Sequence, residues 1–217
     1  MRPLPPQELY TDDYWSHDRD HSTISEQWHN HTLPIHMATP LLCSWVEQCC
    51  REKPAGSRVL EIGCTPGAFL FTMAVKGWAV RGQEASRGLC DDIARHTGLP
   101  AELFTAGLFP QVVPQGPFDV IAAFDVLEHA PDPLAWLRAA GRLLEDDGVI
   151  LLQVPVFDPD DPSEFHEGSL QMWEPGEHVY VFTPAGVRCL LAQAGFGDGN
   201  HESRRLAPGH ELIVVRR

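Results

Sequence analysis

The sequence contains no hydrophobic run long enough to cross a membrane, and its first residues lack the apolar core of a signal peptide. Basic residues are scarce: 16 Lys and Arg stand against 30 Asp and Glu, for a formal net charge of −14. Because phosphates bind basic surfaces, this balance argues against a nucleic-acid partner. The six cysteines form no Cys-x-x-Cys pair and are too sparse for a disulfide scaffold. These absences predict a cytoplasmic protein with reduced thiols.

What the chain does contain is a large apolar fraction, 43% of its 217 residues, which suffices for one domain with a sizeable core. From Thr39 onward, helix-like and strand-like segments alternate, which is typical of a parallel sheet with helices on both faces. A first helix follows Thr39. The expected strands are 58–62, 78–83, 101–105, 118–124 and 149–154, the expected helices are 68–76, 86–97 and 133–144, and a turn is expected at 146–148.

The C-terminal part breaks this alternation. Thr183 and Pro184 start a helix that Gly195 ends, and two further strands, 201–206 and 210–216, are joined by a short Ala-Pro-Gly connection. So short a connection makes the two strands an antiparallel hairpin. The sequence therefore predicts an α/β fold with a mostly parallel sheet and an antiparallel C-terminal hairpin.

The most informative local feature is a glycine turn between the first expected strand and the following helix. The segment Glu61-Ile-Gly63-Cys-Thr-Pro-Gly67 lets a ligand lie against bare backbone and the N–H groups of a helix N-terminus. Glu84 lies 21 residues after Gly63, at the end of the next strand. A carboxylate there can accept hydrogen bonds from both hydroxyls of a ribose. The turn and the acid together predict a nucleoside-binding site.

The segment 59–67 resembles the first motif of class I S-adenosylmethionine (SAM) dependent methyltransferases, whose pattern is acid-x-Gly-x-Gly-x-Gly. The segment 118–129, followed by Pro-Asp-Pro at 131–133, is similar to the fourth-strand motif of one subgroup, which includes the ubiquinone-biosynthesis O-methyltransferases and related small-molecule enzymes. The likeness runs from about Ser57 to the C-terminus and implies a Rossmann-like sheet of seven strands. Thr65 departs from the pattern, since it replaces the middle glycine; we expect it to crowd the methionine end of the cofactor or to donate a hydrogen bond there.

The resemblance also implies where SAM binds, beyond the carboxyl ends of the strands. Gly63 and Gly67 would allow the methionine end to approach, Glu84 would hold the ribose, and the residues that follow the third strand would flank the adenine. The cofactor-binding residues that the resemblance implies are Glu61, Gly63, Thr65, Gly67, Glu84, Ala106, Gly107, Leu108, Phe124 and Asp125.

Three polar residues that directly follow the fourth strand, Asp125, Glu128 and His129, border the same cleft. The methyl group of a sulfonium is already electrophilic, so the enzyme must mainly align the acceptor and take the proton of a hydroxyl. Imidazole titrates in the right range, which makes His129 the candidate catalytic base. A structural role for His129, capping the helix that follows, is the alternative.

The same residues also allow a metal hypothesis. Together with His178, they offer two carboxylates and two imidazoles, which could hold a divalent metal against substrate oxygens. Ubiquinone-pathway enzymes and small-RNA 3′-end 2′-O-methyltransferases carry a similar Glu-x-x-Glu-His with a downstream His. Here the first acid is the shorter Asp125. A divalent metal is therefore an alternative and not the favoured hypothesis.

Two segments are expected to cover the acceptor: the polar, aromatic-rich region 1–38, which precedes the domain at 39–217, and the active-site loop 155–177. Loops of such length in a compact domain are usually functional. The residues predicted to contact the acceptor are Tyr14, Trp15, Glu128, Trp173, His178 and Tyr180.

The sequence thus predicts in-line transfer of a methyl group from SAM to a hydroxyl oxygen of a small molecule. A nitrogen acceptor is the close alternative, because the acidic residues of the cleft and the net charge of −14 suit a cationic amine. Two other classes stay open. One is a nicotinamide-dependent oxidoreductase, which the lack of a Gly-x-Gly-x-x-Gly turn disfavours. The other is a SAM-binding protein without catalysis.

Overall fold

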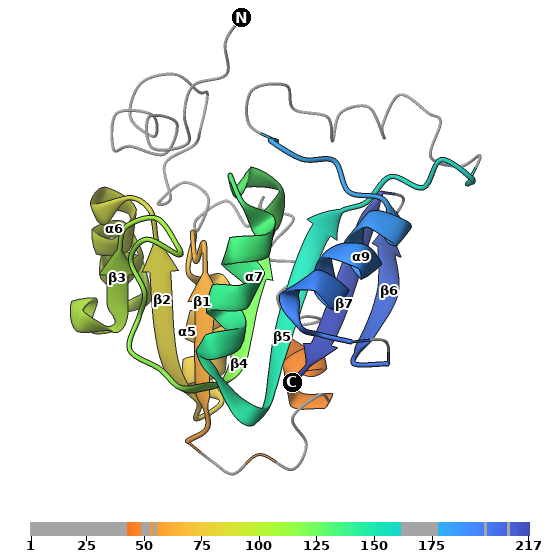
Figure 1. The fold of residues 1–217 in the computed structure, drawn as a ribbon. Coiled ribbons are helices and arrows are strands. Elements are labelled where there is room, and N and C mark those ends of the chain that lie inside the picture. The colour runs from red at the N-terminus through yellow and green to blue at the C-terminus, as the bar shows by residue number, and fades with distance from the viewer. Residues whose placement is uncertain (1–42, 49–52, 54–55, 162–177, 198, 208) are drawn as a thin grey trace, which may run out of the picture.

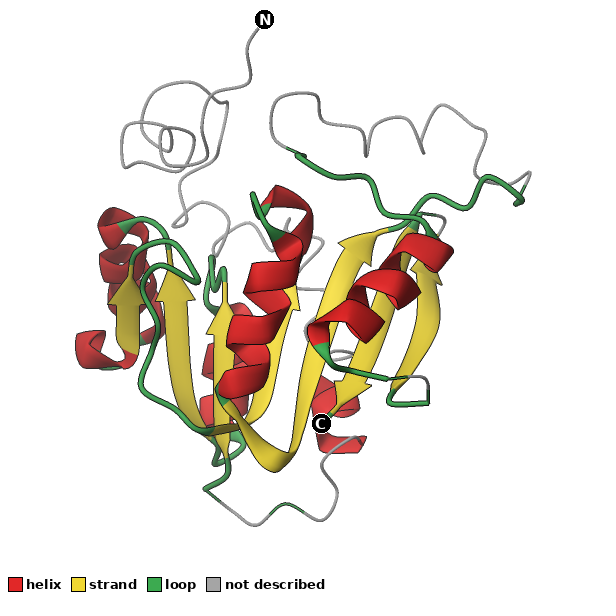
Figure 2. Cartoon of the chain, in the orientation of Figure 1, coloured by secondary structure: helices red, strands yellow, loops and turns green. Residues whose placement is uncertain are grey.

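The computed structural model describes residues 43–48, 53, 56–161, 178–197, 199–207 and 209–217. Seven strands form one sheet in the order β3-β2-β1-β4-β5-β7-β6 (Figures 1 and 2). The neighbours from β3 to β5 are parallel, whereas β7 is antiparallel to both β5 and β6. The predicted fold class, including the reversed C-terminal hairpin, is confirmed.

The elements follow the predicted order. The strands are β1 Arg58–Ile62, β2 Ala79–Glu84, β3 Phe104–Ala106, β4 Phe118–Phe124, β5 Leu144–Pro155, β6 His201–Ala207 and β7 His210–Arg216. The helices are α5 Ala68–Val75, α6 Arg87–Thr97, α7 Pro133–Arg142 and α9 Pro184–Ala194, with short 3-10 helices η1 Ala101–Leu103 and η2 Leu127–His129. Of the helix expected after Thr39, the described part is 43–48. Among the described residues, no helix has the length and apolar character needed to span a membrane.

Two predictions of local structure are wrong. The strand expected at 101–105 begins only at Phe104, because 101–103 form η1, in which the N–H of Leu103 donates to the carbonyl oxygen of Pro100 at 3.0 Å. The turn expected at 146–148 lies inside β5, which already begins at Leu144. Leu144 pairs with Phe118, and the backbone N–H of Phe118 donates to the carbonyl oxygen of Leu143 at 2.7 Å. The register between β4 and β5 then shifts before Val120. Residues on both sides of 146–148 pair with β4. The segment 146–148 is therefore an irregularity inside β5 and not a turn that precedes the strand.

Polar side chains fix where three of the helices begin. Ser86, Asp132 and Thr183 each accept a hydrogen bond from a backbone N–H three residues further along, at 3.1, 2.9 and 3.0 Å respectively. Such caps satisfy N–H groups that have no partner within the helix. At the carboxyl edge of the sheet, α6 begins just beyond β2, and α7 begins after η2, which follows β4.

The core has two layers, one on each face of the sheet. Ile121 of β4 packs in the layer that contains α7 and α9, with Trp136 as its largest buried side chain. The neighbouring Val120 faces the opposite layer, with Leu70 of α5 and Ile93 of α6. Burial on both faces is typical of a central parallel strand. The chain order reverses between β1 and β4, and ligands bind open α/β sheets at such a point.

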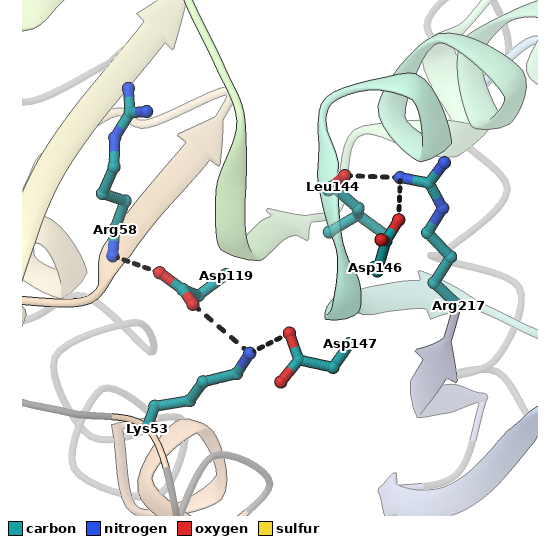
Figure 3. Close-up of polar contacts among 7 residues, drawn as sticks. All are labelled: Lys53, Arg58, Asp119, Leu144, Asp146, Asp147 and Arg217. Carbon is teal, nitrogen blue, oxygen red and sulfur yellow. Dashed lines mark hydrogen bonds and ion pairs between the residues drawn. The ribbon is translucent and has the colours of Figure 1, made fainter.

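At the other end of the sheet, a small polar network joins β1, β4 and β5 (Figure 3). The Nζ atom of Lys53 lies 3.3 Å from Oδ1 of Asp119 and 2.5 Å from Oδ1 of Asp147. Oδ2 of Asp119 accepts a hydrogen bond from the backbone N–H of Arg58 at 2.7 Å. The side chains of Lys53 and Asp119 are 12% and 19% exposed, whereas that of Asp147 is 79% exposed. Asp119 is therefore the central acceptor of this network.

We expect Asp119→Ala to lower the free energy of unfolding by about 2 kcal/mol, because it leaves a backbone N–H and a largely buried ammonium without this acceptor. Asp147→Ala removes an exposed partner of the same lysine and should have a smaller effect, since exposed ion pairs are weak. Urea unfolding at an unchanged m-value measures both. Equal losses of unfolding free energy in the two variants would contradict the assignment of Asp119 as the central acceptor of the network.

Candidate functional site

A cavity of about 500 Å³ opens at the carboxyl ends of the central strands, toward which the arrowheads of β1, β2 and β4 point in Figure 1. It lies at the point where the strand order reverses. Its walls come from the loops after β1, β2, β3 and β4 and from the start of α7. The lining residues are Ile62, Gly63, Thr65, Gln83, Glu84, Ala85, Gly107, Leu108, Phe109, Pro110, Gln111, Phe124, Asp125, Val126, His129, Ala130, Pro131, Asp132, Ala135 and Trp136.

Gly63 opens the loop after β1 and requires glycine for two reasons. Its φ is +70°, in the left-handed region that side chains disfavour. A Cβ at this position would lie 2.5 Å from Cγ2 of Val126. Its backbone N–H donates to the carbonyl oxygen of Gln83 at 2.8 Å, which ties the loop to the end of β2. The loop therefore presents bare backbone to the cavity from a fixed position.

Gly67 has a different role. It precedes α5 with φ at +90°, and a Cβ there would lie 2.5 Å from Cγ2 of Ile93 in α6. Gly67 is buried and is not among the residues that line the cavity. The structure thus gives a packing reason for this glycine, the close approach of α5 and α6, and its expected contact with the cofactor stays a prediction.

Glu84 ends β2 and places a carboxylate on the cavity wall, although only 6% of the residue is exposed. The hydroxyl of Thr65 donates to its Oε2 at 2.8 Å, and the backbone N–H of Ala85 donates to its Oε1 at 2.7 Å. Burial raises the pKa of Glu84, and these hydrogen bonds oppose that shift. The Thr65 hydroxyl thus donates to Glu84 and not toward the methionine end of a cofactor, which was one of the two expectations; the other, that the side chain crowds that end, stays a prediction.

Glu61 lies behind the loop and not on the cavity wall. It is 5% exposed, and its Oε2 has no hydrogen-bond partner in the structure. Burial raises the pKa of Glu61 well above its usual range, the charge of Glu84 adds to this, and the backbone N–H of Leu70 opposes it. A carboxyl group in such surroundings favours its protonated form.

An apolar wall follows β3. Gly107 and Leu108 line the cavity together with Phe109, whose ring packs edge-on against Trp136 of α7, with ring centroids 5.1 Å apart. Ala106, the last residue of β3, is not part of the lining. Aromatic and aliphatic surfaces beside a carboxylate suit a ligand that carries a flat ring and a sugar.

Asp125 directly follows β4 and is the non-glycine residue with positive φ, +53°, in the described part of the chain. Its N–H donates to the carbonyl oxygen of Gln153 at 2.9 Å, and Nε2 of Gln153 donates to its Oδ2 at 2.8 Å. Burial raises the pKa of Asp125, while the nearby His210 and His178 oppose the shift. Backbone strain of this kind is concentrated at functional sites. Asp125 therefore holds a fixed carboxyl group at the cavity edge.

Behind Asp125 lies a cluster of Glu128, His129 and His178, whose candidate ligand atoms all lie within 4.8 Å of one another. The two imidazole rings meet edge-on, with centroids 4.8 Å apart. Glu128 is fully buried, and neither its two oxygens nor Nδ1 of His178 has a hydrogen-bond partner. Burial raises the pKa of Glu128 well above its usual range, and the charge of Asp125 adds to this. A buried carboxyl group without hydrogen bonds is costly unless a proton or a cation neutralises it.

Backbone hydrogen bonds bring His178 to this cluster. The N–H groups of Val179 and Tyr180 donate to the carbonyl oxygen of Glu128 at 2.9 and 3.1 Å. The Tyr180 hydroxyl donates to the carbonyl oxygen of Pro131 at 3.1 Å. These bonds attach the segment that begins at His178 to η2, so the approach of the two imidazoles is part of the fold.

The structure brings eight of the predicted site residues together around the cavity and places six others outside its lining. The predicted residues that line the cavity are Gly63, Thr65, Glu84, Gly107, Leu108, Phe124, Asp125 and His129. The predicted residues that lie outside the lining are Glu61, Gly67, Ala106, Glu128, His178 and Tyr180. Tyr14, Trp15, Trp173, the segment 1–38 and most of the loop 155–177 lie outside the described residues. Sequence reasoning missed the wall formed by Phe109 and Trp136, because nothing in a sequence separates such aromatics from core residues.

Comparisons with known proteins point to one family. A family model described as a methyltransferase domain matches residues 35–198. The ubiquinone biosynthesis O-methyltransferase of Pseudomonas aeruginosa (strain LESB58) is 32% identical over 124 residues, 55% of this chain and 52% of that protein. The protein of the same name from Pseudomonas putida (strain GB-1) is 31% identical over 122 residues, 54% of this chain and 51% of that protein. The chain thus spans about half the length of the curated relatives it matches.

A solved structure resembles almost the whole chain. Magnesium protoporphyrin IX methyltransferase from Synechocystis PCC 6803, with bound S-adenosylhomocysteine, has a TM-score of 0.64 at 16% identity, over 97% of this chain and 97% of that chain. At this level of identity, the likeness shows the fold.

Proposed function

Because the chain belongs to the methyltransferase domain family, we propose that it transfers a methyl group from SAM to an oxygen of a small molecule. The predicted resemblance to class I SAM-dependent methyltransferases, and to the ubiquinone-biosynthesis subgroup, is confirmed by the family match and the curated relatives. SAM is accordingly the cofactor. The comparisons give no support to a nicotinamide-dependent oxidoreductase.

One observation carries the proposed placement of SAM: a bare backbone loop and a fixed carboxylate face the same cavity. In this placement the methionine end lies along Gly63, and the ribose hydroxyls donate to Glu84. The adenine lies against Leu108 and Phe109. The left-handed glycine, the hydrogen-bonded carboxylate and the apolar wall support this arrangement. It leaves the side of the cavity near His129 for the acceptor.

The chemistry needs little beyond alignment and a proton acceptor. The acceptor oxygen attacks the methyl carbon in line with the bond to sulfur, and a carbon–oxygen bond forms as the carbon–sulfur bond breaks. The bonding electrons go to sulfur, which gives S-adenosylhomocysteine. The hydroxyl proton passes to the imidazole of His129 and then to water. The place of His129 in the cavity lining supports this role.

The acceptor is proposed from the site and from the names of the relatives. Ubiquinone biosynthesis O-methyltransferases are O-methyltransferases by name, which favours an oxygen acceptor. Asp125 on the cavity wall keeps a cationic amine as the alternative. The cytoplasmic location and the lack of a nucleic-acid partner stay predictions from the sequence.

A labelled-methyl assay tests the proposed reaction. Incubation with methyl-labelled SAM and a panel of hydroxylated and amine-bearing small molecules should give a labelled product and S-adenosylhomocysteine in equal amounts. NADH should produce no quenching of tryptophan fluorescence, whereas SAM should. Quenching by NADH and not by SAM would reverse the assignment in favour of an oxidoreductase.

A second candidate adds a divalent cation to the same reaction. The unpartnered carboxylate of Glu128 and the unpartnered Nδ1 of His178, with His129 beside them, fit a cation in number and chemistry. When bound there, a divalent cation would polarise acceptor oxygens and acidify a hydroxyl. The cation would also neutralise the buried carboxylate of Glu128, which is otherwise stable only when it is protonated.

The cation hypothesis predicts that Mn²⁺ raises the thermal unfolding midpoint of the chelator-treated protein, and that Glu128→Gln abolishes this rise. Glu61→Gln is the matched control, because it alters another buried carboxyl group with an unpartnered oxygen, away from the cluster. Differential scanning calorimetry measures all three proteins. Turnover that survives a chelator, with no shift by Mn²⁺, would remove the metal and leave Glu128 as a protonated structural residue.

A further inference from the structure

We infer that Thr65 is a positioning residue, whose hydroxyl holds the carboxylate of Glu84 in the orientation that the ribose of SAM requires. The inference rests on the proposed function in one respect, the assignment of Glu84 as the ribose acceptor. It gives a role to the one position at which the glycine motif departs from its usual pattern.

The geometry joins two loops through one carboxylate. Oγ1 of Thr65, in the loop after β1, lies 2.8 Å from Oε2 of Glu84, at the end of β2. The N–H of Ala85 donates to the other carboxylate oxygen at 2.7 Å. Each oxygen of the carboxylate thus has a donor from a different loop, and Thr65 and Glu84 both line the cavity. The donors restrict rotation of the carboxyl group about its last side-chain bond.

Backbone contacts make the Thr65 loop a firm support. The N–H groups of Gly63 and Cys64 donate to the carbonyl oxygen of Gln83 at 2.8 and 3.3 Å. The side-chain amide of Gln83 in turn donates to the carbonyl oxygen of Gly107. The loops after β1, β2 and β3 therefore form one hydrogen-bonded unit around Glu84. A preorganised acceptor loses less conformational entropy when a ligand binds.

The surroundings of Glu84 explain why an additional donor matters. Burial raises its pKa, and the hydrogen bond from the Thr65 side chain is the largest opposing contribution. The buried Glu61 lies near enough for the charge of Glu84 to raise the pKa of Glu61 too. Ribose hydroxyls donate best to an ionised carboxylate. A glycine in place of Thr65 would supply no side-chain donor to keep that charge.

The hydrogen bond from Thr65 to Glu84 leaves the hydroxyl no proton to donate to the cofactor. A threonine hydroxyl has a single proton, and that of Thr65 is donated to Glu84. As a donor, Thr65 therefore acts on SAM through the carboxylate. Loss of its hydroxyl should affect recognition of the ribose.

The test compares two ligands and two variants by isothermal titration calorimetry. The ligands are S-adenosylhomocysteine and its 2′-deoxyribose analogue. Thr65→Val, which keeps the shape and lacks the hydroxyl, should weaken binding of S-adenosylhomocysteine about tenfold, the effect of one charge-assisted hydrogen bond. It should weaken the 2′-deoxy analogue far less, because that ligand relies less on Glu84. Thr65→Ser should restore the wild-type preference for the ribose.

Two results would overturn the inference. One is unchanged affinity of Thr65→Val for S-adenosylhomocysteine; the other is an equal loss for both ligands, which would indicate a general structural effect. In a Glu84→Gln background, Thr65→Val should cause no further loss, and additive losses would equally count against the inference. Wild-type protein that does not discriminate between the ligands would instead contradict the placement of the ribose, which separates the failure of this inference from that of the proposed function.

Discussion

Replacement of Glu84 by alanine should weaken the binding of S-adenosylhomocysteine by at least about 100-fold. The carboxylate is buried, hydrogen-bonded and part of the cavity wall, and in the proposed placement both ribose hydroxyls donate to it. Its loss removes two charge-assisted hydrogen bonds and leaves two ligand hydroxyls without an acceptor in a poorly solvated site. Isothermal titration calorimetry of the folded variant measures the change.

Glu102→Ala is the matched control for this experiment. Glu102 lies in η1, is exposed and is not part of the cavity lining, so its replacement changes the net charge in the same way without altering the site. The affinity of this variant should stay at the wild-type value. If both variants bind S-adenosylhomocysteine as the wild type does, the ribose does not lie on Glu84.

Replacement of His129 by alanine should lower kcat by about 10²-fold to 10⁴-fold on a hydroxyl acceptor found in the panel, the usual contribution of general-base catalysis. Affinity for S-adenosylhomocysteine should remain close to that of the wild type, because His129 lies on the acceptor side in the proposed placement. Single-turnover measurements of methyl transfer separate this effect from changes in acceptor binding.

His96→Ala controls for loss of an imidazole elsewhere. His96 lies in α6, where its ring contacts the carbonyl oxygen of Asp92 at 2.8 Å, and it does not line the cavity. Full activity in that variant and loss of activity in His129→Ala would exclude a SAM-binding protein without catalysis. Unchanged kcat in His129→Ala, together with a lower unfolding midpoint, would instead assign His129 the structural role that the sequence left open.

The sheet could be predicted because its signals are local. The segment 118–124, apolar except for Asp119, is long enough for a buried strand and matches β4 in full. Ser86 and Thr183 carry the side chains that cap helices, and Gly195 ends α9 in the left-handed conformation. The exceptions are the strand expected at 101–105, whose first three residues form η1, and the turn expected at 146–148. Residues 146–148 have turn chemistry, but pairing with β4 on both sides of them decides their conformation.

The cavity could be predicted in part for the same reason. Gly63 and Glu84 each lie at the end of a strand, so the spacing along the chain places both at one edge of the sheet. The partner of Thr65 could not be predicted, because it depends on a side-chain contact between two loops. Nor could the role of Gly67, which is set by Ile93 from another helix. The hydrophobic periodicity of one element does not reveal which side chains of another element it will contact.

The cluster of Glu128, His129 and His178 shows the same limit. The metal hypothesis from the sequence names Asp125, Glu128, His129 and His178, and the structure brings the last three of these together. The full burial of Glu128 and its lack of hydrogen bonds are properties of the packed molecule. The metal experiment tests whether a cation accounts for this buried carboxyl group, a question that the spacing of the residues along the sequence does not raise.

Titration of the purified protein with S-adenosylhomocysteine in a calorimeter tests most directly whether the cavity above β1, β2 and β4 binds SAM. We predict heat from a single site per chain, competition by SAM, and loss of most of the affinity in Glu84→Ala. Folded wild-type protein that gives no heat with either compound at millimolar concentration would contradict the assignment of this cavity.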